Sequence, residues 1–152
     1  MGDRKLILDA LGPSLKEAGF KKQAGNWYRS NDEIILMVNI QKSQYGDQYY
    51  INIGIALKSL GVVQYPKEHN CHIRFRLTAL VKEDEKKHID SIFDLENKSF
   101  SETQRTEEIC MLVQNILLPT LKECSSEQEV LELVKRNKFV NGMVHVKIKN
   151  LV

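Results

Sequence analysis

The sequence predicts an α+β fold: an antiparallel four-stranded meander with an N-terminal helix and C-terminal helices packed on one face. Apolar residues recur at helical spacing near the start, the period changes to two from about residue 26, and helix-capping signals return after residue 100. The chain has 152 residues, 42% of them hydrophobic and 28% charged. This is enough for a core without disulfides or metal, so we expect a single globular domain over residues 1–152.

The first predicted element is a helix that begins at Asp3, a residue type suited to capping, and ends near Ala18. Pro13 lacks the N–H of the helical ladder, so we expect a kink or a restart there. Gly19 can adopt the left-handed conformation that ends a helix, and Phe20 can then fold back onto it. The apolar stripe consists of Leu6, Ile7, Ala10, Leu11, Leu15 and Ala18.

Three strands are predicted next, at Trp27–Arg29, Glu33–Ser43 and Gln48–Lys58. If the turn-prone residues 44–47 form a four-residue loop, the second and third strands pair with one continuously aliphatic face. The aliphatic pairs are Ile40 with Ile51, Val38 with Ile53, Leu36 with Ile55, and Ile34 with Leu57. The opposite face then pairs Gln41 with Tyr50, Asn39 with Asn52, and Met37 with Gly54.

The flanking strands extend both faces of this predicted pair. A two-residue turn at residues 31–32 places Trp27 beside Leu36 on the aliphatic face, with Tyr28 beside Ile35 on the other. A fourth strand is predicted at Cys71–Leu77, where two sets of residues alternate. The core-facing set is Cys71, Ile73, Phe75 and Leu77, and the polar set is His72, Arg74 and Arg76.

The second half of the chain is predicted to be mainly helical. Ser101 and Gln104 have the spacing of a capping box, and an apolar stripe follows them to Leu117. We expect Pro119 to bend the last turns of this helix. Ser126 opens another helix, and residues 144–149 alternate in the manner of an edge strand with lysine outside.

Composition narrows the functional class. The chain carries 22 Lys and Arg against 20 Asp and Glu, a balance that argues against a dedicated nucleic-acid binder. Its three cysteines have no metal-ligand spacing and fit reduced thiols. No apolar run approaches the length of a membrane span, so we expect a cytoplasmic protein that binds neither membrane nor nucleic acid.

Four segments carry a resemblance to a known family. They are Asn26–Arg29, Val38–Gly46, Tyr50–Gly54 and Cys71–Leu77. The N-x-Q-K-S segment followed by Y-I-N-x-G is the most specific part. These residues resemble the bacterial domain of unknown function 4304 family, which brings no established activity. The resemblance implies a small intracellular protein, with an immunity-type partner of a bacterial toxin as one associated role.

The predicted binding residues lie on the polar side of the sheet. They are Asn39, Gln41, Tyr50, Asn52, His72, Arg74 and Arg76. Amide, phenol and guanidinium groups suit a carboxylate, a phosphate or a polar protein surface. The alternative is an ordinary water-facing side of an antiparallel sheet. Asparagine is depleted in strands, so two asparagines predicted opposite each other need an explanation. Gly54 would leave room for close approach to this face.

The segment Glu68–His72 offers several metal-ligand types, but strand alternation sends Cys71 and His72 to opposite faces. The same opposition prevents them from meeting as nucleophile and base, although His69 could approach from the loop. We therefore expect no metal, cofactor or catalytic residue here. Lys21 and Lys22 beside Trp27 mix basic and aromatic groups as a nucleic-acid surface does, yet Trp27 is better explained as core.

The sequence thus predicts a non-catalytic binding or protein-interaction module, with an immunity-type inhibitor as one form and a protein or small anionic ligand as partner. The alternative is a small enzyme in which Arg74 and Arg76 orient an anionic substrate and His72 or His69 acts as acid or base. Self-association through the polar face or the edge at residues 144–148 is a third hypothesis.

Overall fold

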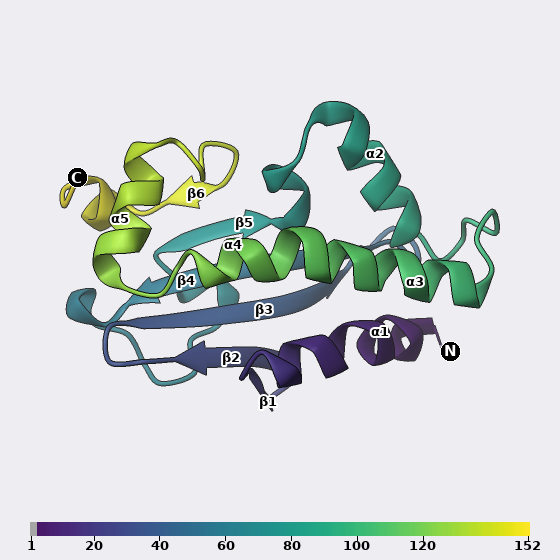
Figure 1. Ribbon diagram of the computed structural model, residues 1–152, viewed down its shortest axis with the longest axis horizontal. Coiled ribbons are helices and arrows are strands. Elements are labelled where there is room, and N and C mark those ends of the chain that lie inside the picture. The colour runs from purple at the N-terminus through teal and green to yellow at the C-terminus, as the bar shows by residue number, and fades with distance from the viewer. Residues whose placement is uncertain (1–2) are drawn as a thin grey trace.

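The computed structural model describes residues 3–152 and combines an open antiparallel sheet with helices (Figure 1). The strands are β1 (Lys21–Gln23), β2 (Asn26–Ser30), β3 (Ile34–Lys42), β4 (Tyr49–Leu57), β5 (Ile73–Arg76) and β6 (Met143–Val144). The helices are α1 (Asp3–Glu17), α2 (Glu83–Ile92), α3 (Glu102–Leu112), α4 (Leu118–Lys122), α5 (Glu127–Lys135) and α6 (Val146–Lys149), with a π-helical turn η4 (Val113–Leu117) between α3 and α4. Short 3-10 turns are η1 (Lys58–Leu60), η2 (Glu68–Asn70) and η3 (Leu77–Leu80).

The sheet has six strands in the order β1-β2-β3-β4-β5-β6, so the prediction of four strands is wrong. The two additional strands lie at the edges and are very short. β1 consists of Lys21–Gln23, which has no apolar alternation and is turned back by Ala24 and Gly25 at φ angles of 52° and 84°. A polar three-residue strand gives no periodic signal, which explains why it was missed.

The tail also differs from the prediction. Only Val144 of the predicted strand at residues 144–149 pairs in the sheet, and the chain then forms α6. The His145 Nδ1 accepts the N–H of Lys147 at 3.0 Å, which caps the short helix. Only Ile148 of this helix is buried, a pattern that six alternating residues cannot distinguish from a strand.

The predicted β3–β4 register is confirmed at every pair, including Asn39 with Asn52 and Gln41 with Tyr50. The turn before β3 is longer than predicted, because Ser30 pairs with Ile35. The Asn31 Oδ1 accepts two N–H groups in this turn, those of residues 33 and 34. Because the register moves by two residues, each side chain keeps its predicted face.

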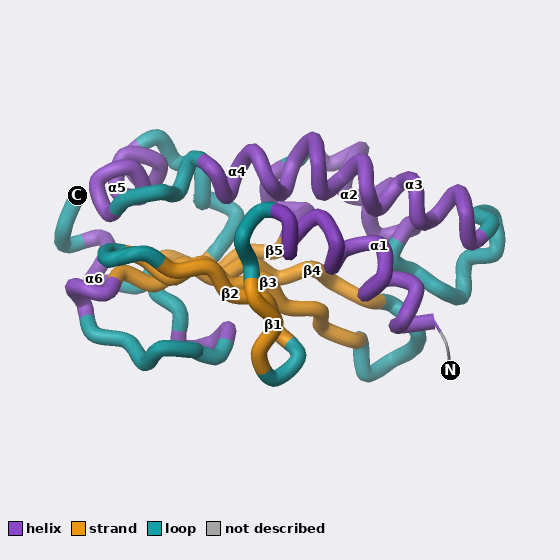
Figure 2. The backbone as a smooth tube through the Cα atoms, turned by 60° about the horizontal axis from the view of Figure 1, so that its bottom comes forward, coloured by secondary structure: helices purple, strands orange, loops and turns teal. Residues whose placement is uncertain are grey.

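All the long helices pack on the aliphatic face, as Figure 2 shows for α1, α3 and α4. Asp3 is the first described helical residue, and its predicted capping contact lies outside the described side chains. α1 runs through Pro13 as one helix, so the predicted restart is not seen. The helix ends at Glu17, Gly19 follows it with φ at 93°, and the Phe20 N–H returns to the Leu15 carbonyl at 2.9 Å.

The rod formed by α3, η4 and α4 crosses the same face of the sheet (Figure 1). The predicted capping box at Ser101 and Gln104 is present. The helix widens to a π turn at Val113–Leu117, just before Pro119, whose missing N–H interrupts the regular ladder. The helices therefore bury one side of the sheet and leave the other side to loops and solvent.

Candidate binding face

The polar side of the sheet is divided into two halves. In the covered half, the segment at residues 62–71 lies over an apolar cluster. Tyr65 contacts Tyr28 with ring centroids 5.2 Å apart, and Val62 packs beside it. The cluster consists of Tyr28, Ile35, Met37, Ala56 and Cys71. The open half consists of Asn39, Gln41, Tyr50, Asn52 and Arg76.

A ladder of side-chain amides crosses the open half. The Asn52 amide nitrogen donates to the Asn39 carbonyl oxygen at 3.2 Å and to the Gln41 carbonyl oxygen at 2.9 Å. Asn39 in turn donates to Asn26 at 2.7 Å. Asn52 is only 7% exposed, and these bonds satisfy its buried amide nitrogen. The two facing asparagines are thus joined by one hydrogen bond within a ladder that runs from Gln41 to Asn26.

The donor and acceptor roles along this ladder are set at its buried end, where Tyr28 meets Pro66. The Pro66 carbonyl can only accept, so the Tyr28 hydroxyl donates to it, at 2.8 Å, and must then accept from Asn26 at 3.3 Å. Asn26 and Asn39 therefore each accept at the amide oxygen and donate at the amide nitrogen, and the Asn52 nitrogen donates in both directions, to Asn39 and to Gln41. Gln41 accepts from Asn52 through its oxygen, so its NH₂ group is turned to solvent. The exposed end of the ladder presents donors.

Arg76 supplies the second set of donors. It pairs with Asn52 in the β4–β5 register, and its guanidinium carbon lies 3.8 Å from the centroid of the Tyr50 ring. Tyr50 pairs with Gln41 on its other side. The ring of Tyr50 therefore lies between the exposed Gln41 amide and the exposed Arg76 guanidinium.

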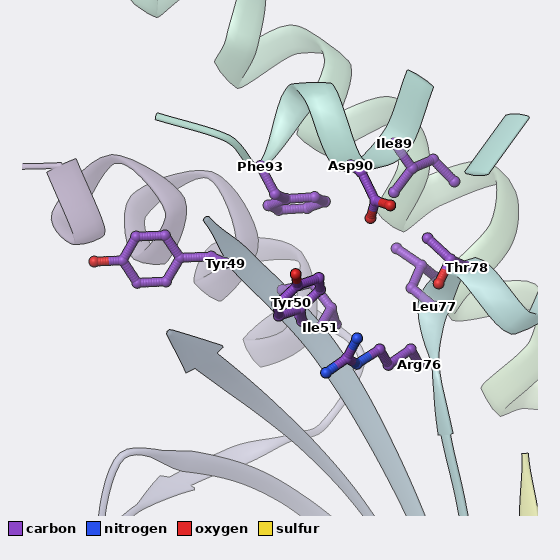
Figure 3. A pocket seen from close by; sticks show the side chains of 9 residues that line it. All are labelled: Tyr49, Tyr50, Ile51, Arg76, Leu77, Thr78, Ile89, Asp90 and Phe93. Carbon is purple, nitrogen blue, oxygen red and sulfur yellow. The ribbon is translucent and has the colours of Figure 1, made fainter. Parts of the chain in front are cut away.

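A small cleft lies beside Arg76, where α2 borders the open half (Figure 3). The Asp90 carboxylate points into the gap above Tyr50 and Arg76. Burial raises the pKa of Asp90, and the positive charge of Arg76 opposes this rise. The cleft measures about 10 Å³, room for a single water molecule at most. It adds one carboxylate to the rim of the face but does not enclose a ligand.

Arg74 lies on the predicted side of the sheet, but its guanidinium already has partners within the protein. Its guanidinium lies 3.6 Å from the Glu68 carboxylate and contacts the sulfur of Met143. The register puts it opposite Gly54, between the covered half and the β6 edge. It is half-buried and less available than Arg76.

His72 does not belong to the exposed face, which corrects the prediction that grouped it with Arg74 and Arg76. Its Nδ1 accepts the Leu57 N–H at 2.9 Å, and its ring packs against His145 with centroids 6.2 Å apart. Burial lowers the pKa of His72, and the nearby His145 and Lys147 lower it further. The regular strand begins only at Ile73, so alternation does not govern His72.

The prediction for Cys71, which rested on strand alternation, is also wrong. Cys71 packs in the covered half and not in the main core. Burial raises the pKa of its thiol to about 12, which leaves it protonated at neutral pH. A Cβ atom at Gly54 would lie 2.5 Å from the Cys71 sulfur and 2.9 Å from Met37 Cγ. The space predicted at Gly54 for a ligand is filled by the protein itself. Within residues 3–152, no group of three potential metal ligands comes together.

One buried residue that supports the face was missed. Arg105 of α3 is 5% exposed and donates to the backbone carbonyls of Ile92, Asp94 and Asn97. It ties the end of α2 and the following loop to α3, which positions Asp90 beside the face. Its place four residues before Ile109 in the apolar stripe of α3 could have revealed an arginine that faces inward.

The comparisons with known proteins identify a family without assigning an activity. No curated protein and no protein of known structure shows a significant match. No helix in the described part of the chain is long and apolar enough to cross a membrane. The family model described as Domain of unknown function (DUF4304) matches residues 11–123, which include α1 from its middle, the first five strands and the rod of α3 and α4. The chain therefore belongs to the DUF4304 family.

Proposed function

We propose that this protein is a non-catalytic, cytoplasmic protein-interaction module whose open half binds an acidic segment of a partner protein. The observation that carries the proposal is the pair of donor groups on either side of Tyr50, the Gln41 amide and the Arg76 guanidinium. Both side chains are exposed. The guanidinium has no acceptor, and the Gln41 oxygen already accepts from Asn52, which leaves the Gln41 NH₂ group as an outward donor. Their natural complement is a carboxylate.

Preorganisation supports this assignment. The amide ladder that begins at Pro66 holds the Gln41 carbonyl inward, so its NH₂ group does not have to reorient on binding. Tyr50 supports the planar guanidinium of Arg76, whose fork matches a carboxylate in two parallel hydrogen bonds. Groups already held in the binding geometry lose less conformational entropy when a partner docks.

The shape of the face favours a protein over a small anionic ligand. The cleft beside Arg76 is about 10 Å³, whereas sites that enclose small ligands measure roughly 300–1,000 Å³. A broad sheet face with a few projecting polar groups fits an opposing protein surface. An immunity-type inhibitor that covers an active partner is one concrete form of such a module.

The enzymatic alternative has less support. Its proposed acid or base, His72, already accepts the Leu57 N–H and lies in a buried position. The neighbouring thiol of Cys71 has a pKa of about 12 and is a poor nucleophile at neutral pH. His69 remains the histidine on which a catalytic role for this region would depend.

The proposal is tested by capture of partners from the source organism with the tagged protein and two arginine variants. Arg76→Ala should lose a partner that the wild-type chain retains, because the carboxylate loses its bidentate donor. Arg136→Ala is the matched control, since Arg136 is exposed at the end of α5, away from the sheet face. If both variants retain the same partners as the wild-type chain, Arg76 is not the contact and the proposal fails.

A further inference from the structure

A second site lies between α1 and the hairpin of β1 and β2. Figure 2 shows where these two elements lie in the fold. It is an open groove of about 700 Å³, within the size range of small-molecule sites. Leu8, Gly12 and Lys16 contribute from successive turns of α1, and Trp27 contributes from β2. It shares no residue with the open half, so it is independent of the proposed function.

The floor of the groove is apolar and preformed. Trp27 is 4% exposed and Phe20 is 2% exposed, so both are held firmly by the core beneath. Gly12 lies on the α1 side of the groove, and a Cβ there would be in ordinary van der Waals contact with Trp27, at 3.8 Å.

The rim of the groove is positively charged. Lys16 and Lys22 line it, and the Lys22 ammonium lies 5.3 Å from the centroid of the Trp27 ring. Among the described residues, neither lysine forms an ion pair. The one acidic side chain of the lining, Asp9, is paired with Lys5 at 2.8 Å. An anion that enters the groove therefore meets ammonium groups and no free carboxylate.

We propose that this groove binds a small amphiphilic carboxylate, with the apolar chain along Leu8 and the alkyl parts of the lysines, above the buried rings of Phe20 and Trp27, and the carboxylate between Lys16 and Lys22. The apolar part gains from removal of its surface from water. The carboxylate gains charge-assisted hydrogen bonds from the two ammonium groups. A neutral or cationic molecule with the same apolar part lacks this second contribution.

The fluorescence of Trp27 reports directly on the site, because it is the only tryptophan of the chain. Sodium decanoate, kept below its micelle concentration, should produce a saturable change in emission. Decylamine, with the same chain length and a positive charge, should bind at least about tenfold more weakly, and acetate should have no effect. Equal responses to decanoate and decylamine, or a change with decanoate that does not saturate, would refute the proposal.

Two variants separate the floor from the rim. Gly12→Leu fills the groove and should abolish the decanoate response, while the helix remains intact because leucine is a better helix former than glycine. Lys16→Gln combined with Lys22→Gln should weaken decanoate about tenfold and leave decylamine no weaker. Lys87→Gln, an exposed lysine of α2, is the matched control and should bind as the wild-type protein does. Undiminished decanoate binding by Gly12→Leu, with circular dichroism like that of the wild-type protein, would overturn the assignment of the groove.

Discussion

The covered and open halves of the polar side both include parts of β3 and β4, yet they are stabilised in different ways. In the covered half, Met37 and Ala56 are apolar and need the segment at residues 62–71 above them. In the open half, Asn52 donates to Asn39 and to Gln41 within the plane of the face, and no segment covers these side chains. The comparison shows that a sheet face can stay exposed where its polar groups pair within the plane of the face.

The largest effect is expected in the covered half, from Gly54→Ala. The new methyl group meets Cys71 and Met37 at distances too short for any Cβ atom, so the covering segment must move. We expect a loss of about 2 kcal/mol in the free energy of unfolding, measured by urea denaturation. Adding Cys71→Ala should recover part of this loss. A change below about 0.5 kcal/mol would mean that the covering segment yields freely.

A smaller effect is expected in the open half, from Asn52→Ala. This change removes both hydrogen bonds that Asn52 donates and should cost about 1 kcal/mol, because water can reach the neighbouring amides and replace part of the lost bonding. Gln41→Ala, at the exposed end of the same ladder, should cost less than about 0.5 kcal/mol. Urea denaturation of the two variants side by side measures the difference. Equal costs would contradict the view that the ladder is anchored at its buried member.

The fold should also respond to acid through the buried His72, which lies next to the covered half. Its Nδ1 must be unprotonated to accept the Leu57 N–H, and its pKa is lower than the ordinary value of 6.5. The unfolded chain therefore takes up this proton at higher pH than the folded chain. The contribution to stability is full above about pH 6.5 and is lost as the pH falls toward the folded pKa.

Melting temperatures measured between about pH 7 and pH 5 test this dependence. His72→Gln should flatten the decline in stability over this range relative to the wild-type protein. His69→Gln, in the exposed η2 turn, is the control and should keep the wild-type pH dependence. An unchanged slope in His72→Gln would show that another group titrates.

The smallest effect on stability is expected at Arg76. Its guanidinium is exposed and lies on Tyr50, so Arg76→Ala should change the free energy of unfolding by less than about 0.5 kcal/mol. Thermal or urea denaturation provides the measurement. A loss of more than about 1 kcal/mol in the free energy of unfolding would show that Arg76 stabilises the fold, and would argue against its role as a contact for a partner.

The features that the sequence predicted well are those set by long alternation. β3 and β4 have nine residues each, and a shift by one would have exposed the whole aliphatic set, so their register could be read from the pattern. The facing asparagines and the Gln41–Tyr50 pair followed directly from that register.

The features that were missed depend on contacts between distant segments. Cys71 and His72 precede the first regular residue of β5, so their orientation is set by the loop and not by alternation. The space at Gly54 is filled by Cys71, which lies 17 positions further along the chain. The direction of the amide ladder depends on Pro66, in a loop with no periodic signal, and β1 is too short to show one.

The donor character of the open half is the central claim, and an NMR titration of the side-chain amides tests it most directly. On addition of a hexaglutamate peptide, the NH₂ resonances of Gln41 should shift, while those of Asn26, inside the ladder, should move much less. A hexalysine peptide at the same ionic strength should leave Gln41 unchanged. Shifts at Gln41 with hexalysine, or none with hexaglutamate, would contradict a face built to receive a carboxylate.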